Sequence, residues 1–129
     1  MEQDKTPGAI TWMDLTVPNA DQVRDFYKQV VGWTTIDINM GEYNDYCMAS
    51  PSDNHVWAGI CHARGSNAGL PAAWIMYINV ANLDESIIHV LALGGEVIHG
   101  PRNMGEKARY CMIKDPAGAV CALFDHGTD

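Results

Sequence analysis

A repeat with an offset of 63 residues constrains this chain more than any other feature of its sequence. The pattern Val-x-Asn-x-Asp occurs at residues 17–21 and again at residues 80–84, and 80 − 17 = 63. Gly32 and Gly95 keep the same offset downstream. In each copy an apolar run ends in Val, Asn can cap a helix and Gly can end that helix. The chain has 129 residues, so we predict one domain, residues 1–129, built from two similar halves.

Hydrophobic periodicity predicts the same order of elements in both halves. In the first half, a strand and a helix precede three further strands: 9–17, 20–31, 33–40, 43–49 and 55–62. In the second half the corresponding segments are 72–80, 83–93, 96–99, 107–114 and 119–125, with a loop at 100–105. The predicted fold is therefore α+β. Two βαβββ modules, about 9–62 and 72–125, form curved mixed sheets around a cavity.

Charge and hydropathy exclude several classes of partner. The formal net charge is −8, from 16 acidic and 8 basic residues, which argues against nucleic acid and anionic membranes. No apolar run approaches the roughly 20 residues that span a bilayer. The first five residues, Met-Glu-Gln-Asp-Lys, lack the apolar region of a signal peptide. We therefore expect a cytoplasmic protein whose four cysteines, which form no Cys-x-x-Cys pair, are reduced.

Three segments carry a resemblance to a known family. They are Asp25-Phe26-Tyr27 with Val31-Gly32-Trp33, Leu93-Gly94-Gly95 with Gly100-Pro101, and residues 115–119, Asp-Pro-Ala-Gly-Ala. In this order, and within two βαβββ modules, they resemble the vicinal oxygen chelate superfamily of glyoxalase I, bleomycin-resistance proteins and extradiol dioxygenases, and in particular its bacterial glyoxalase-like subgroup. The resemblance implies a small-molecule ligand. Relatives of this size often pair, which makes a homodimer one expectation.

The resemblance also implies where a metal would be bound. Metal-dependent members place a His or Gln near the start of each module's first strand and a Glu in its last strand. Counting from the repeat, these positions fall on Trp12 and Ile75, on Ala122, and at or near Gly59. None of these side chains can ligate a metal. We therefore predict no cofactor and none of the family's usual metal chemistry.

Polar candidates for the expected cavity are few. Asp14 shares a strand face with Trp12 and could act as a general base or hold a cation, or it could be structural. Tyr77 and Asn79 could hydrogen-bond a ligand, although Tyr77 could equally be a core aromatic. Arg109 could bind a carboxylate or phosphate, and an ion pair, for instance with Asp14, is the alternative.

Four aromatic residues are the expected walls of the cavity, and core packing is the alternative for each: Trp12, Trp57, Trp74 and Phe124. The five histidines form no metal-binding spacing. His62 and His99 stand at strand ends, where a structural role is expected and a role at the cavity mouth is the alternative. Two functions follow. The first is a metal-free binder of a small organic molecule, and the second is a glyoxalase-like lyase, isomerase or dioxygenase-type enzyme with a non-standard or metal-dependent site. A module that docks on a partner enzyme is a third alternative.

Overall fold

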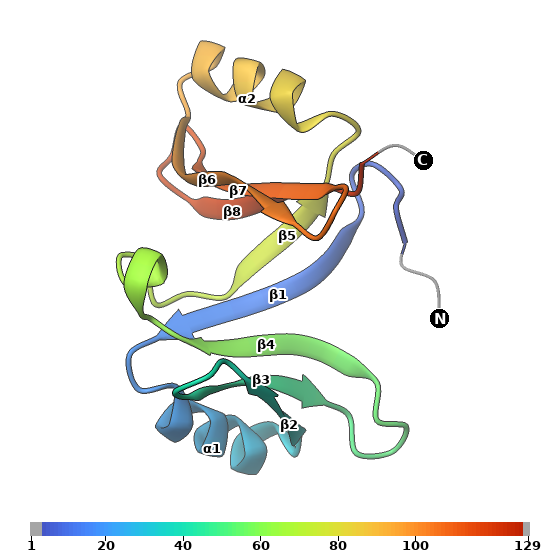
Figure 1. Cartoon of the computed structure of the whole chain (residues 1–129), viewed down its shortest axis with the longest axis vertical. Coiled ribbons are helices and arrows are strands. Elements are labelled where there is room, and N and C mark those ends of the chain that lie inside the picture. Colours follow the sequence, from blue (N-terminus) through green and yellow to red (C-terminus); the bar gives the residue numbers. More distant parts are fainter. Residues whose placement is uncertain (1–3, 128–129) are drawn as a thin grey trace. The chain divides into compact units, whose positions relative to one another are not determined.

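The computed structural model describes residues 4–127, which contain eight strands and two helices in two compact units (Figure 1). The first unit comprises residues 13–74, and the second comprises the segment up to Trp12 together with the residues from Ile75 onward. Strand β1, Ile10–Val17, contributes its first three residues to the second unit and the rest to the first.

The first unit follows the order β-α-β-β-β. After β1 come helix α1, Ala20–Val31, and strands β2, Thr34–Asn39, β3, Asn44–Ala49, and β4, Val56–His62. Strand β1 pairs with β4 in parallel, and β4, β3 and β2 pair antiparallel. A short 3₁₀ helix, Gly65–Asn67, follows β4, between the two predicted modules.

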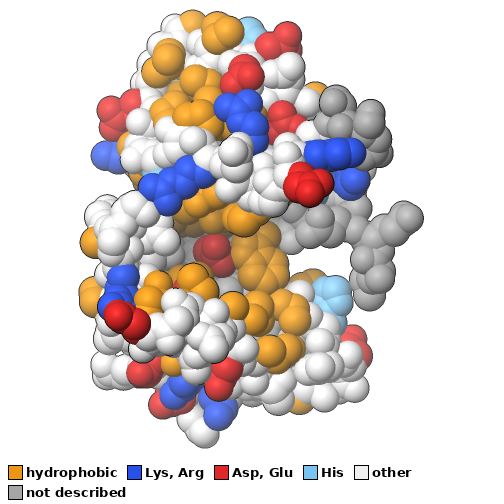
Figure 2. All heavy atoms as spheres, in the orientation of Figure 1, with side chains coloured by type: hydrophobic (Ala, Val, Ile, Leu, Met, Phe, Trp, Pro, Cys, Tyr) orange, Lys and Arg blue, Asp and Glu red, His pale blue; other side chains and the backbone are white. Residues whose placement is uncertain are grey.

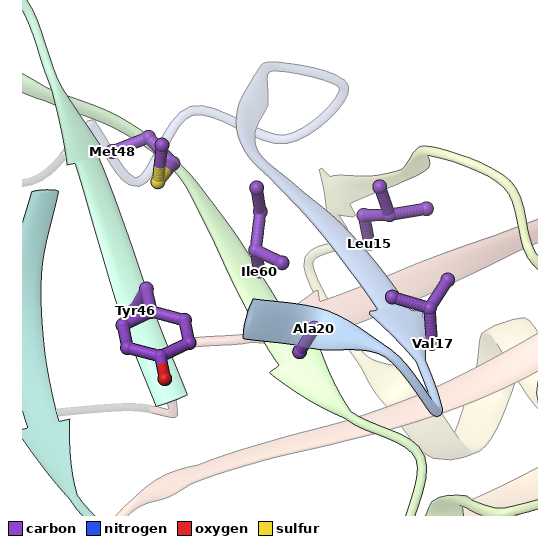
Figure 3. Close-up of a cluster of buried hydrophobic side chains, with 6 residues drawn as sticks. All are labelled: Leu15, Val17, Ala20, Tyr46, Met48 and Ile60. Atoms are coloured by element: carbon purple, nitrogen blue, oxygen red, sulfur yellow. The ribbon is translucent and has the colours of Figure 1, made fainter. Parts of the chain in front are cut away.

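Alternating side chains place one face of this sheet against α1. Leu15 and Val17 of β1, Tyr46 and Met48 of β3, and Ile60 of β4 form a buried cluster with Ala20 (Figure 3). Figure 3 shows these side chains coming from three strands and from the first turn of the helix. The residues of opposite parity therefore project from the face that carries no helix.

The second unit repeats this arrangement with β5, Ile75–Asn79, α2, Leu83–Ala92, and strands β6, Glu96–Met104, β7, Ala108–Lys114, and β8, Val120–Asp125. Strand β5 pairs with β8 in parallel, and β8, β7 and β6 pair antiparallel. The core between sheet and helix consists of these buried residues: Leu83, Cys111, Ile113 and Leu123. The predicted α+β class with two βαβββ modules is confirmed.

The two capping asparagines behave differently. Asn82 accepts a hydrogen bond from the Glu85 amide at 3.1 Å and caps α2 as expected. Asn19 stands at the same position of α1, but its side chain donates to Gln22 and makes no capping bond. Gly32 then ends α1 in the left-handed conformation, with φ = 87°.

Both helices carry apolar side chains outside the core. On α1 these are Phe26, Val30 and Val31, and on the end of α2 they are Ile88, Leu91 and Leu93. Apolar atoms accordingly lie at the surface over α2 in Figure 2. Among residues 4–127, no helix has the length and hydropathy that a bilayer crossing requires.

The structure corrects one element. The sequence predicts a short strand at 96–99 and a loop at 100–105, whereas β6 runs unbroken from Glu96 to Met104. The pairing with β7 shifts register between His99 and Arg102, because three residues of β6 span two of β7. Glycine and proline at positions 100 and 101 mark this β-bulge, not the end of the strand.

Candidate functional site

Two rows of side chains cross the helix-free face of the second unit's sheet. The strand registers place one row in the order Tyr77, Ala122, Met112 and His99. They place the adjacent row in the order Asn79, Phe124, Tyr110 and Arg102. Four strands therefore contribute aromatic, sulfur-containing, imidazole and cationic side chains to one surface.

The aromatic rings of these rows touch one another. The Tyr110 ring centroid lies 6.2 Å from that of Tyr77 and 6.1 Å from the His99 ring. Such separations lie within the range of favourable ring contacts. Tyr77 and His99 are buried, and Tyr110 is half-buried. This face thus has the mixture typical of small-molecule sites, an apolar surface with a few placed polar groups.

The Nε2 atom of His99 is buried and has no hydrogen-bond partner among the described residues. Burial, and secondarily the positive charge of Arg102, lower the pKa of His99 below its ordinary value. The neutral imidazole is therefore the expected form at pH 7. A neutral ring nitrogen can donate or accept one hydrogen bond, depending on the tautomer.

The Asn79 side chain is hydrogen-bonded to residues of its own unit. Its Nδ2 donates to the Asp4 carbonyl at 2.8 Å, and its Oδ1 lies 3.0 Å from His126 Nε2 and 3.4 Å from Thr11 Oγ1. Its backbone also pairs with Gly8 and Ala9. The side chain that the sequence suggests as a ligand group thus anchors the segment before β1. Phe124, its neighbour in the row, contacts the His126 ring at 4.7 Å.

Arg109 lies on the other face of the same sheet, beside α2. Its Nη1 donates to both carboxylate oxygens of Asp84, at 3.1 and 3.2 Å. The ion pair that the sequence offers as the alternative therefore exists, with Asp84 as the partner. Arg109 lines a pocket of about 370 Å³ with Asn82, Lys107 and Asp125. Asp125 in this pocket accepts a hydrogen bond from the Leu83 amide at 2.9 Å. The chain itself therefore supplies an acceptor for an amide in the first turn of α2.

In the first unit, Asp14 lies on the helix-free face. Its neighbour in register is Gly59, which pairs with Cys47 in turn. Burial raises the pKa of Cys47 and of Cys61, and the negative charge of Asp14 adds to both shifts. The carboxylate thus lies beside two thiols that stay protonated at neutral pH.

The three predicted tryptophans occupy different environments. Trp74 donates to the Tyr27 hydroxyl at 3.1 Å and packs against the core beneath α1, the core-packing alternative. Trp57 is 55% exposed, donates to Ser50 Oγ at 3.1 Å and contacts the His55 ring. Trp12 is half-buried in β1.

His62, which the sequence places at a strand end, is part of a polar network in the first unit. Its Nδ1 lies 3.3 Å from Asp45, and its Nε2 lies 3.4 Å from Asp21 in the first turn of α1. The Tyr46 hydroxyl donates to the same Asp21 carboxylate. These contacts tie the start of α1 to β3 and β4.

The positions that correspond to the family's metal ligands do not fit a metal. Gly59, Ile75 and Ala122 are buried and have no donor atom in their side chains. The indole of Trp12 offers only an N–H donor. Across residues 4–127, no group of three or more His, Cys, Asp or Glu side chains is arranged to hold a metal ion.

Tyr110 was not among the residues that the sequence suggested for the site, and His99 was placed at a strand end with a role at the cavity mouth as one alternative. The alternation of the β7 segment was a usable signal for Tyr110, since residues 110 and 112 share parity. No comparable signal existed for His99 and Arg102. Their numbers differ by three, so simple alternation puts them on opposite faces, and only the bulge brings them to one.

Comparison with known proteins identifies the family. Curated relatives include the anthracycline biosynthesis proteins DnrV of Streptomyces peucetius, 29% identical over 94% of this chain, and DauV of Streptomyces sp. strain C5, 28% identical over 94%. This chain spans about half of their length, 48% of each.

Among solved structures, methylmalonyl-CoA epimerase from Mycobacterium tuberculosis has a TM-score of 0.58 at 12% identity, covering 99% of this chain and 93% of the epimerase. The Streptomyces coelicolor epimerase has a TM-score of 0.57 at 13% identity, with 95% and 100% covered. These likenesses show a shared fold. Residues 9–123 match the description Glyoxalase/Bleomycin resistance protein/Dioxygenase superfamily, and the chain belongs to that superfamily.

Proposed function

We propose that this protein binds a small aromatic organic molecule on the helix-free face of its second unit, without the family's usual metal. The observation that carries the proposal is the cluster of Tyr77, Tyr110 and His99 rings on one side of four strands. Aromatic faces bind planar ligands by offset or edge-to-face contacts. Phe124 extends the same surface.

The chemical class of the ligand is suggested by the relatives. Two of them are named as anthracycline biosynthesis proteins, and anthracyclines are planar ring systems that bear hydroxyl and carbonyl groups. A surface of tyrosine rings with an imidazole and a nearby guanidinium suits such a molecule. Asp14 remains a separate proposal, as a polar ligand-binding group on the helix-free face of the first unit.

Titration of the anthracycline daunorubicin, followed by its own fluorescence, tests the proposal. We expect saturable binding at one site per chain, unchanged after treatment of the protein with EDTA. Tyr110→Ala should weaken binding about tenfold, because one aromatic contact contributes ~1–1.5 kcal/mol. Phe26→Ala, which removes an exposed ring on α1, is the matched control and should bind normally. Absence of saturable binding would refute the proposal, and loss of binding after EDTA would refute its metal-free part.

We also propose that a second copy of the chain packs on the end of α2. The exposed Leu93 borders an apolar groove of about 340 Å³ that Val90 and Pro116 help to line. The curated relatives are about twice as long as this chain, so a second copy would supply a similar length. Sedimentation velocity should give a dimer for the native protein and for Phe26→Glu, and a monomer for Leu93→Glu. A native monomer at all concentrations would exclude this pairing.

A further inference from the structure

The Nε2 atom of His99 is a buried polar atom for which the fold supplies no partner. The side chain is 8% exposed, and it holds the one buried side-chain polar atom of residues 4–127 that has no hydrogen-bond partner. A buried polar atom without a hydrogen bond is destabilising, and such atoms are rare in native proteins. His99 therefore needs an explanation beyond packing.

The local backbone is built to present this side chain. Two register shifts with β7, one between Val97 and His99 and one between His99 and Arg102, put both His99 and Arg102 on the helix-free face. Gly100 has φ = 85°, and a Cβ there would lie 3.0 Å from the Tyr110 carbonyl oxygen. Only glycine meets both conditions without strain. The bulge thus fixes the imidazole against the Tyr110 ring, at 6.1 Å between centroids.

We propose that His99 Nε2 is a ligand-binding atom that accepts a hydrogen bond from a phenolic hydroxyl of a planar aromatic ligand, whose ring lies against Tyr110. This inference rests on the proposed function, because it assumes that an aromatic molecule binds this face. A neutral imidazole is a good acceptor for a weakly acidic hydroxyl. The positive charge of Arg102 contributes to the lowered pKa of His99. The same charge would attract the oxygen atom of the ligand's hydroxyl group.

The proposal requires a ligand to reach Nε2 from the helix-free face. Arg102 lies on that face and is exposed, whereas Met112 and Ala122 are buried. Exposed side chains change rotamer within nanoseconds. The proposal therefore places the approach of the ligand on the Arg102 side of His99.

The test compares two probes that differ only in the hydroxyl, 2-naphthol and 2-methoxynaphthalene, by isothermal titration calorimetry. The native protein should bind 2-naphthol at least tenfold more tightly. His99→Phe should bind both probes within twofold of each other, with its affinity for 2-methoxynaphthalene unchanged. His99→Gln, which places an amide oxygen near the Nε2 position, should recover part of the preference. Equal affinities in the native protein would overturn the role of His99 and leave the proposed function standing.

A second measurement needs no variant. In protein labelled with ¹⁵N-histidine, 2-naphthol should shift the Nε2 resonance of His99, and 2-methoxynaphthalene should not. Equal shifts with both probes, or none with 2-naphthol at saturation, would contradict the inference. If the native protein binds neither probe nor daunorubicin, the proposed function itself fails and the role of His99 fails with it.

Discussion

Asn79→Ala should lower the stability of the protein more than Asn82→Ala or Asn19→Ala. The side chain is 1% exposed and makes two short contacts, at 2.8 Å to the Asp4 carbonyl and 3.0 Å to His126. Each such hydrogen bond contributes ~1 kcal/mol net, and the 3.4 Å contact with Thr11 adds little. With the lost packing, the free energy of unfolding should fall by about 2–3 kcal/mol.

Calorimetry measures this change against two matched variants. For a chain of this size, 1 kcal/mol corresponds to roughly 4 °C, so Asn79→Ala should lower Tm by about 10 °C. Asn82→Ala removes one helix cap and should lower Tm by about 4 °C. Asn19→Ala removes no capping bond and should change Tm by less than about 2 °C.

Hydrogen exchange locates the effect. The Gly8 amide donates to the Asn79 carbonyl at 2.7 Å, so its exchange reports on the attachment of the segment before β1. In Asn79→Ala this amide should exchange faster by more than the global loss of stability explains, because the side-chain anchor on Asp4 is gone. If Tm falls no further than in Asn82→Ala and Gly8 exchange is unchanged, Asn79 is not the anchor described above.

Three further outcomes follow from the geometry. Gly95→Ala should cost about 1–3 kcal/mol, since a Cβ there would lie 2.7 Å from the Lys114 carbonyl oxygen, whereas Gly69→Ala meets no atom within 4 Å and should be neutral in urea denaturation. Cys111 is buried with its pKa raised to about 11, so at pH 8 iodoacetamide should modify it far more slowly than the half-buried Cys47, as peptide mass mapping would show; equal rates would contradict its burial. Because burial lowers the pKa of His99, the unfolded chain binds the proton more tightly, and stability should decline as pH falls below about 6.5. In His99→Gln, the free energy of unfolding measured by urea denaturation should differ less between pH 7.5 and pH 5.5 than it does in the native protein. An unchanged difference would argue against this contribution of His99.

Much of the fold was predictable because local signals and the repeat agree. The first helix is predicted at 20–31 and runs from Ala20 to Val31, since the apolar period, Asp21 and the terminal Gly32 all favour it. The pattern is less informative about burial. Val23 and Tyr27 pack on the core, whereas Phe26, Val30 and Val31 are exposed, because one sheet covers only a narrow stripe of a helix.

The candidate site was less predictable because it depends on contacts between distant residues. Sequence parity correctly groups Tyr77 with Asn79, but it cannot show that the Asn79 amide is occupied by Asp4. It also cannot show that Arg109 lies on the opposite face of the sheet and pairs with Asp84 there. These are tertiary pairings over 25 or more positions, and periodicity carries no information about them.

The register of the two units has a consequence for how this chain can diversify. Asp14 pairs in register with Gly59 in the first unit, and Tyr77 pairs with Ala122 in the second. The same structural position therefore carries an acid opposite a glycine in one half and a phenol opposite an alanine in the other. A duplicated scaffold lets one copy acquire new chemistry while its twin keeps the old. The double substitution Asp14→Tyr with Gly59→Ala, or Tyr77→Asp with Ala122→Gly, would therefore change the chemistry of one face at a backbone position that carries either pair in the native chain.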